Sequence, residues 1–306
     1  MSVKEQVLAM LENNKGCYLS GADLAEQLNV SRNSVWKAVK ALQEEGYQIQ
    51  AVTNKGYCLN TDNDILSVQS ITKYLDTQLN NLRLDVRKSV SSTNDLLRTL
   101  AQDGAAEGLV LIAEEQKSGK GRLSGRKFHS PAASGIYMSI LLRPTIQATE
   151  ALFITTSAAV AAAKAIETVS GRSTQIKWVN DIFCDGKKVC GILTEAAFNL
   201  EGGNLDYAVL GIGINVKRPP QGFASDIENI AGAVLEPGQN VEDIRSKLIA
   251  AILHNFWQYY KALDKHTFLP EYKQRSLVVG KQIYVLDGDN KKPARAVAVT
   301  DTCELL

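Results

Sequence analysis

The sequence predicts an α+β protein built around a mixed β-sheet. Between residues 82 and 264, strand patterns follow one another between separated helical patterns, which is typical of a mixed sheet. Short helices and a hairpin occupy the first sixty residues, and a second hairpin pattern follows Gly280. A chain of 306 residues has room for two or three domains. We expect domains at residues 1–62, 66–272 and 273–306.

Composition restricts the cellular setting and the partners. The chain is 45% hydrophobic and 22% charged with a net charge of +1, so any basic site must be local. The apolar run 158–163 ends at Lys164, and we therefore expect no membrane-spanning segment and no membrane partner. The first residues do not form a secretory signal. Five scattered cysteines suit a reducing compartment, so we expect a cytoplasmic protein.

The first sixty residues predict a winged helix-turn-helix. Residues 21–28 form a short helix, and Ser31 is a good N-cap for a second helix over 32–45. The buried face of that helix follows the helical period: Val35, Ala38, Val39 and Leu42. A hairpin with Lys55 at its turn comes next. Such a second helix fits a DNA major groove, and the residues expected to contact DNA are Ser31, Arg32, Asn33, Ser34, Lys37, Lys40 and Lys55.

Charge indicates that two copies of this domain act together. Residues 1–64 hold six Lys or Arg against eight Asp or Glu. Because phosphate neutralisation supplies most non-specific affinity, a single copy should bind DNA weakly. We expect a dimer on a palindromic site or no DNA binding at all. A role in protein contacts remains an alternative for so small a helical domain.

Five strands and three helices are expected in the central region. The strands are 82–88, 108–115, 135–143, 189–197 and 207–216, and the helices are 92–101, 149–169 and 241–264. A sheet edge near 135–143 or 189–209 is a candidate dimer contact. After Gly280 we expect a hairpin that turns at residues 287–290, in a small β-barrel-like domain that is incomplete because few residues follow.

Residues 119–128, GKGRLSGRKF, combine four cations with three glycines. Glycines let backbone N–H groups approach a phosphate, and cations neutralise it, so the segment is a candidate anion-binding loop. It does not open a helix and lacks the Walker pattern. A solvated surface turn is the other interpretation, and spacing alone does not choose between them.

Further signals follow along the chain. KWVND (177–181), GKKVCGILTE (186–195) and GIGINV (211–216) each place polar groups or glycines at strand ends. Taken in this order with SSTN (91–94), EEQ (114–116) and the GKGR loop, they resemble the biotin protein ligases. The chain is most similar to the bifunctional form that also represses the biotin operon, and the resemblance covers nearly its whole length.

The resemblance implies both an activity and a regulatory role. Such a protein joins biotin to ATP, releases pyrophosphate, and passes the biotinyl group to a lysine of a biotin carboxyl carrier domain. Biotinyl-5′-AMP would also promote a homodimer that binds operator DNA. The implied architecture is a winged helix-turn-helix, a ligase domain of the biotin/lipoate type and an SH3-like C-terminal domain. Biotin and ATP are the implied substrates, with Mg²⁺ as the metal.

The family's motifs also imply site residues. Two anionic substrates must meet, so Arg122 and Lys188 would neutralise them, while Asp181 is a candidate base and Mg²⁺ ligand. The implied biotin-binding residues are Ser92, Thr93, Asn94, Gln116, Lys120, Arg122, Lys188 and Gly191. Those implied for ATP or the adenylate are Gly119, Gly121, Lys177, Trp178, Asn180, Gly213 and Asn215. The glycine-rich loop would fold over the adenylate and exclude water.

The chain departs from the family pattern in three places. Lys120 stands where the family often has arginine, which keeps the charge without the bidentate geometry. Leu123 and Ser124 occupy a place where one residue is expected, which leaves the roles of Arg126 and Lys127 open. The short tail implies weaker ATP affinity or carrier docking.

Three other functions compete with this interpretation. A biotin-sensing repressor without turnover would not need the ATP-binding residues. A lipoate or octanoate ligase shares the core fold but not the DNA-binding region or the GKGR loop. The third alternative is a ligase whose winged helix only orients the enzyme. The exposed cations of that domain favour DNA binding over this alternative.

Overall fold

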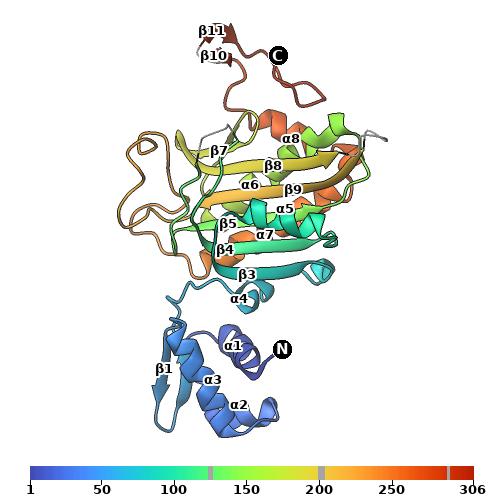
Figure 1. Ribbon diagram of the computed structural model, residues 1–306. Helices are drawn as coiled ribbons and strands as arrows, with labels where there is room; N and C mark the ends of the chain where they lie inside the picture. Colours follow the sequence, from blue (N-terminus) through green and yellow to red (C-terminus); the bar gives the residue numbers. More distant parts are fainter. Residues whose placement is uncertain (123–126, 199–203, 288–289) are drawn as a thin grey trace. The chain divides into compact units, whose positions relative to one another are not determined.

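The computed structural model describes residues 1–122, 127–198, 204–287 and 290–306. They form two compact units, one of Met1–Leu75 with Asn240–Ala250, the other of Asp76–Gln239 with Ala251–Leu306 (Figure 1). The predicted α+β class is confirmed, with an N-terminal helix-turn-helix, a mixed central sheet and a small antiparallel pair of strands near the C-terminus.

The first unit contains the helices and the hairpin expected from the sequence, and two further helices, α1 and α4. Its elements are α1 (Val3–Asn13), α2 (Gly21–Gln27), α3 (Arg32–Glu44), β1 (Ile49–Val52), β2 (Gly56–Leu59) and α4 (Val68–Thr72). Strands β1 and β2 pair antiparallel. The four apolar residues that were expected to face the core from α3 are all buried, and α1 packs Val7, Leu8 and Leu11 into the same cluster.

Buried charges hold residues 240–250 in the first unit. Lys15 forms an ion pair with Asp243, and Lys73 Nζ lies 2.8 Å from Glu12 Oε2 and 2.6 Å from Asp243 Oδ2. Their side chains are between 1% and 11% exposed. Tyr74 also donates its hydroxyl to Asp243 at 2.9 Å. Helix α7 (Ile244–Tyr260) therefore contributes residues to both units.

The second unit is built on a seven-stranded sheet in the order β3-β4-β5-β9-β8-β7-β6. The strands are β3 (Arg83–Val90), β4 (Leu109–Gln116), β5 (Gly135–Leu142), β6 (Gln175–Lys177), β7 (Asp181–Cys184), β8 (Lys187–Phe198) and β9 (Leu205–Asn215). Only β3 and β4 run parallel; the other neighbouring pairs are antiparallel. The five expected strands are confirmed, and β6 and β7 complete the sheet.

Helices cover both faces of this sheet (Figure 1). Besides part of α7, the helical elements of this unit are η1 (Thr77–Leu79), α5 (Thr93–Gln102), η2 (Ala148–Glu150), α6 (Ala151–Ser170), η3 (Leu263–Lys265) and α8 (Leu269–Gln274). On one face Ser139 of β5 contacts Asn94 of α5 at 2.6 Å. On the other, Thr194 of β8 contacts Thr155 of α6 at 2.7 Å. Ser139 pairs with Gly211, which pairs with Leu193, so these three residues point to the same face of the sheet. Thr194 is the next residue along β8 and therefore points to the opposite face. Helices α5 and α6 thus pack on opposite faces.

Helix α6 is more apolar than its broken run in the sequence indicated. The segment Ala148–Ser170 is long and apolar enough to cross a membrane by length and composition, although no such segment was expected. In the structure 72% of its most apolar window is buried, and α6 packs on the sheet. Its apolar composition thus serves the core of the second unit.

The sheet edges also differ from the expectation. Strand β5, expected at an edge, lies between β4 and β9 and is buried along its whole length. Strand β8 pairs with β7 only between residues 187 and 191, and the backbone of Ile192 bonds to Asn180. In the described part of the chain, residues 193–198 have no strand partner on that side. Part of the expected 189–209 edge is therefore open.

Two further strands near the C-terminus pair antiparallel, β10 (Gln282–Asp287) with β11 (Asn290–Arg295). They form the hairpin that was expected after Gly280, and its central residues 288–289 lie outside the described residues. Beyond it, Cys303 is buried, and its carbonyl oxygen accepts a hydrogen bond from Trp178 Nε1 at 2.8 Å.

Candidate functional site

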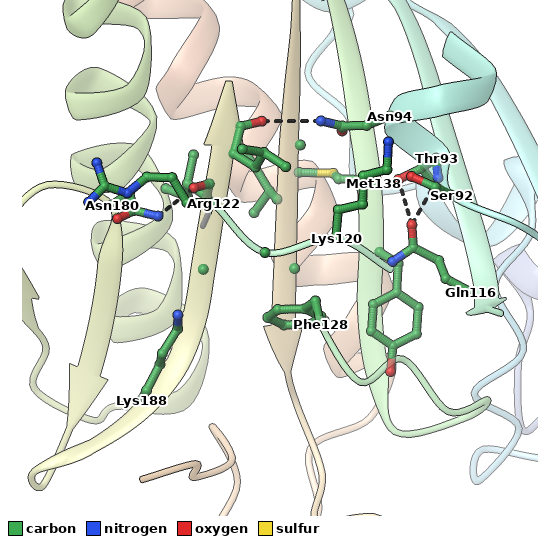
Figure 2. Close-up of a pocket in the computed structure, with 18 residues that line it drawn as sticks. Ser92, Thr93, Asn94, Gln116, Lys120, Arg122, Phe128, Met138, Asn180 and Lys188 are labelled. Carbon is green, nitrogen blue, oxygen red and sulfur yellow. Dashed lines mark hydrogen bonds between the residues drawn. The ribbon is translucent and has the colours of Figure 1, made fainter. Parts of the chain in front are cut away.

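The first candidate site is a cavity on the α5 face of the sheet, beside the loop that follows β4 (Figure 2). About 490 Å³ of empty space lies within it, part of which is open solvent at its mouth. The residues that line it are Ser92, Thr93, Asn94, Gln116, Lys120, Gly121, Arg122, Phe128, Tyr137, Met138, Asn180, Lys188, Gly191, Ile192, Leu193, Gly211, Ile212 and Gly213.

One end of the cavity carries oriented polar groups. Ser92 caps α5 by accepting a hydrogen bond from the backbone N–H of Asp95 at 3.3 Å. Gln116 Oε1 accepts from Thr93 N at 2.8 Å and from Thr93 Oγ1 at 3.0 Å, while Gln116 Nε2 donates to Ser130 Oγ at 2.9 Å. The Gln116 amide is therefore held in one orientation, which suits recognition of a ligand by matched hydrogen bonds.

Asn94 lies against the floor of the cavity and is 5% exposed. Its Nδ2 donates to Glu195 Oε2 at 2.8 Å, and its Oδ1 lies 2.6 Å from Ser139 Oγ. A Cβ atom at Gly211 would come within 2.2 Å of Asn94 Oδ1. The first glycine of GIGIN, Gly211, thus makes room for a side chain of the protein.

Among the described residues, three cations line the cavity: Lys120, Arg122 and Lys188. Lys188 Nζ is 2.6 Å from Asp181 Oδ1, and Lys120 Nζ is 2.5 Å from an oxygen of Asp95. The two lysine side chains remain 31% and 41% exposed. An anion that enters the cavity therefore meets positive charge that is accessible to it.

Phe128 divides this cavity from a second one. Its ring lies against β9, where a Cβ atom at Gly213 would come within 2.7 Å of it, and it meets Tyr137 edge-on at 6.3 Å between centroids. The second cavity is lined by Lys127, Phe128, His129, Pro131, Lys188, Cys190, Asn215, Pro219, Phe223, Ile227, Ile230 and Ala231. The two compartments therefore share one aromatic ring and one cation, Phe128 and Lys188.

The structure brings most of the predicted site residues together. Those that line the first cavity are Ser92, Thr93, Asn94, Gln116, Lys120, Gly121, Arg122, Asn180, Lys188, Gly191 and Gly213. Asn215 lines the second cavity. Asp181 contacts Lys188 from β7, and Gly119 accepts a hydrogen bond from the backbone of Phe128 at 2.9 Å.

Two predicted residues point elsewhere. Trp178 donates to the Cys303 carbonyl, and Lys177 Nζ lies 5.9 Å from the centroid of the Phe183 ring. Neither is among the described residues that line the two cavities. Arg126 and the Leu123–Ser124 pair lie outside the described residues, whereas Lys127 lines the second cavity.

Sequence reasoning missed the apolar walls and the second cavity. Tyr137 and Leu193 look like ordinary core residues of strands, and Phe128 gave no signal apart from its place in the loop motif. The far wall of the second cavity comes from residues 219–231, which have no regular period. Burial raises the pKa of the Cys190 thiol far above its usual range, so this lining residue stays neutral.

A protein-only metal centre is not found in the described ranges, where no group of three or more His, Cys, Asp or Glu side chains is placed to hold an ion. Asp181 supplies one carboxylate, and Lys188 already pairs with it. This donor set fits Mg²⁺ only if phosphate oxygens and water supply the other ligands, as is usual for this ion.

The residues predicted to contact DNA lie around α3 and the hairpin of the first unit. Ser31 caps α3 by accepting from the backbone N–H of Ser34 at 3.1 Å. Arg32 and Lys55 line one hollow between α2, α3 and the β1–β2 turn. The other predicted residues, Asn33, Lys37 and Lys40, are exposed.

Comparisons with known proteins agree with this geometry. Residues 86–215 match the Biotin/lipoate A/B protein ligase family, and residues 3–58 match an HTH domain. The chain is 34% identical over 270 residues to the bifunctional ligase/repressor BirA of Bacillus subtilis, covering 88% of this chain and 82% of that protein. It is 30% identical over 295 residues to BirA of Escherichia coli, covering 95% and 87%.

The structure is also similar to a biotin protein ligase from Aquifex aeolicus solved in complex with biotin and ATP. The TM-score is 0.59 at 25% identity, covering 73% of this chain and 90% of the other. The two matched families cover the regions that form the helix-turn-helix and the central sheet, and the BirA relatives match across both regions. The chain therefore belongs to the family of bifunctional ligase/repressor BirA proteins.

Proposed function

We propose that this protein activates biotin with ATP to biotinyl-5′-AMP and transfers biotin to a lysine of a biotin carboxyl carrier domain. The observation that carries the proposal is the pair of adjoining cavities that share Lys188 and Phe128. Two substrates that bind side by side would meet at that cation. A site for one ligand would not need the second compartment.

Biotin would occupy the first cavity. The ureido ring needs both donors and acceptors, and the fixed amide of Gln116 with the hydroxyl of Thr93 offers them. The apolar surface offered by Phe128, Tyr137 and Leu193 suits the rest of the molecule. The carboxylate would then lie toward the cations.

ATP would occupy the second cavity. Phe128 and Phe223 offer aromatic and apolar surface for a purine, and Asn215 offers an amide for polar contacts. Lys127 and Lys188 lie at the same compartment and would neutralise phosphates. Mg²⁺ would be held by the phosphates together with Asp181, and it would neutralise phosphate charge when bound.

In the first step a biotin carboxylate oxygen bonds to the α-phosphorus, and the bond from that phosphorus to pyrophosphate breaks. Both reactants are anionic, so Lys188 and Arg122 would reduce their repulsion and hold them in line. In the second step the uncharged amine of the carrier lysine attacks the biotinyl carbonyl carbon, and AMP leaves. Asp181, 2.6 Å from Lys188, is the candidate to accept the proton.

The first unit would bind operator DNA through α3 and the hairpin, and biotinyl-5′-AMP would act as corepressor. Arg32, Lys37, Lys40 and Lys55 supply the cations for phosphate contacts. We assign the homodimer contact to residues 193–198 of β8, which within the described chain have no strand partner on the side away from β9. All of these steps would take place in the cytoplasm.

The test combines chemistry and DNA binding on the purified protein. Biotin-dependent exchange of pyrophosphate into ATP should be measurable, and Lys188→Ala and Arg122→Ala should each lower its rate by about 10²–10³-fold. The product should appear as biotinyl-5′-AMP by mass spectrometry. Binding to a palindromic operator in a gel shift should strengthen when biotin and ATP are both present.

The same assays separate the competing functions. A sensor without turnover would bind biotin and DNA but exchange no pyrophosphate. A lipoate or octanoate ligase would show exchange with those acids in preference to biotin. A ligase whose winged helix only orients the enzyme would biotinylate carrier normally and show no gel shift.

A further inference from the structure

We infer that Asp95 is a positioning residue that holds Lys120 at the cavity in the geometry required for biotin activation. The inference rests on the proposed function, because Lys120 is needed there only if an anionic substrate binds. Asp95 lies on α5 beside the cavity and is not among the described residues that line it. It would act through Lys120 without touching substrate.

A continuous chain of charged and polar groups supports this role. Lys120 Nζ lies 2.5 Å from Asp95 Oδ1, and Arg98 Nη2 lies 2.7 Å from the same oxygen. Arg98 Nη1 is 3.3 Å from Glu195 Oε1, and Glu195 Oε2 accepts from Asn94 Nδ2 at 2.8 Å. The chain thus joins the loop cation to the buried amide on the cavity floor.

Within this series of contacts, Asp95 is held more firmly in place than Lys120. It lies in the first turn of α5, where the helix dipole favours a carboxylate, and the next turn supplies Arg98 at i+3. Its neighbour Asn94 is fixed by close contact with Gly211. Lys120, in contrast, sits on a loop and has a long flexible side chain. The helix therefore determines where the lysine lies.

Stabilising the fold does not explain the Asp95–Lys120 pair well. The two side chains are 29% and 41% exposed, and ion pairs with such exposure contribute little to stability. A pair with little structural value at the edge of a ligand cavity is better explained by what it does for the cation. That value would appear in the kinetics.

Long-range charge and positioning predict opposite effects on biotin activation when the charge of Asp95 is removed. The two carboxylates, Asp95 and Glu195, balance the two cations, Lys120 and Arg98, so the group is neutral as a whole. Removing the charge of Asp95 leaves one excess positive charge near an anionic substrate. Coulomb attraction alone would then strengthen binding, whereas loss of positioning would weaken the reaction.

The experiment is the pyrophosphate exchange assay on the full chain carrying Asp95→Asn. We expect kcat/KM for biotin to fall about tenfold, with part of the loss restored in Asp95→Glu, which keeps the charge. In a Lys120→Met background, Asp95→Asn should have no further effect, because the residue acts through that lysine. The matched control is Asp85→Asn on β3, whose carboxylate pairs with Arg87 at 2.8 Å.

Several outcomes would overturn the inference. A higher kcat/KM in Asp95→Asn would show that long-range charge outweighs positioning. An unchanged kcat/KM would show that Asp95 does not influence the reaction. A full tenfold loss in the Lys120→Met background would show that Asp95 does not act through the lysine. If the melting temperature shows that Asp95→Asn is unfolded, Asp95→Glu takes its place: a loss of kcat/KM in that variant that persists in full in the Lys120→Met background would overturn the inference. Inactive wild type would overturn the proposed function as well.

Discussion

Gly211 of β9 and Asn94 of α5 are in such close contact that a single added carbon would not fit between them. A Cβ atom at position 211 would lie 2.2 Å from Asn94 Oδ1 and 2.9 Å from its Cγ. The same Asn94 side chain is bonded to Glu195 and Ser139. The glycine therefore fixes the depth at which the amide lies under the cavity.

Gly211→Ala should displace Asn94 and damage both the cavity and the fold. We expect the unfolding free energy to fall by about 2 kcal/mol, as for other overpacked core sites. The KM for biotin should rise, because the amide can no longer keep its place beneath the ligand. Urea denaturation and pyrophosphate exchange measure the two effects.

The control for this prediction is the double variant Gly211→Ala with Asn94→Ala, which removes the side chain that the methyl group strikes. Its stability should exceed that of Gly211→Ala alone, while biotin binding stays weak. A double variant less stable than the single one would mean that the clash lies elsewhere.

Phe128→Leu should separate the roles of the two cavities. Leucine keeps an apolar side chain against Gly213 but removes the aromatic ring that we propose stacks on the purine. Stacking of a base on an aromatic side chain contributes about 1–3 kcal/mol, so the KM for ATP should rise about tenfold. The KM for biotin should change less, and equal changes in both would contradict our placement of ATP.

The sequence predicted most of the strands because their apolar runs are long and regular. Strands β6 and β7 were not predicted, because they are three and four residues long and too short to show a periodic pattern. The polar residues of the cavity were identified through motifs that the family shares. The contact of Asn94 with Gly211 was not, because the two are far apart in sequence and a glycine gives no hint of what fills its space.

Residues 240–250 show a second limit of sequence reasoning. Lys15, Lys73 and Asp243 look like solvated surface charges in the sequence, yet they are nearly buried together in the first unit. Buried charges require partners of opposite charge. These partners are far apart in the sequence, so no local pattern predicts them. Tertiary structure alone reveals that this segment belongs with the winged helix.

Asp243→Asn should destabilise the first unit strongly. Burial tends to raise the pKa of Asp243, but hydrogen bonds from Lys15, Lys73 and Tyr74 outweigh it and hold the pKa below its usual range. The variant would leave two nearly buried lysines short of negative charge, at a cost of about 3 kcal/mol. Denaturation of the full chain checks this against Glu45→Gln, which removes the exposed pair with Lys4 and should change stability little.

Glu167→Gln should make the second unit less sensitive to acid. Arg275 contacts both oxygens of Glu167, at 2.6 and 2.8 Å, and Thr174 donates to it through its backbone N–H and its hydroxyl. The hydrogen bonds from Arg275, together with smaller contributions from Thr174, outweigh burial and lower the pKa of Glu167 below its usual value. A carboxyl group with a depressed folded-state pKa stabilises the fold above its unfolded pKa.

The contribution of Glu167 should therefore be complete above about pH 5 and disappear as pH falls through the folded-state pKa. Above that range we expect the variant to be less stable by about 1 kcal/mol, allowing for partial exposure of the pair. Below pH 4 the difference between wild type and variant should shrink. Unfolding in urea at a series of pH values tests this, and a difference that stays constant down to pH 3 would mean that the carboxylate charge is not what Arg275 binds. Glu228→Gln, which removes the exposed pair with Arg218, is the control that should show no such convergence.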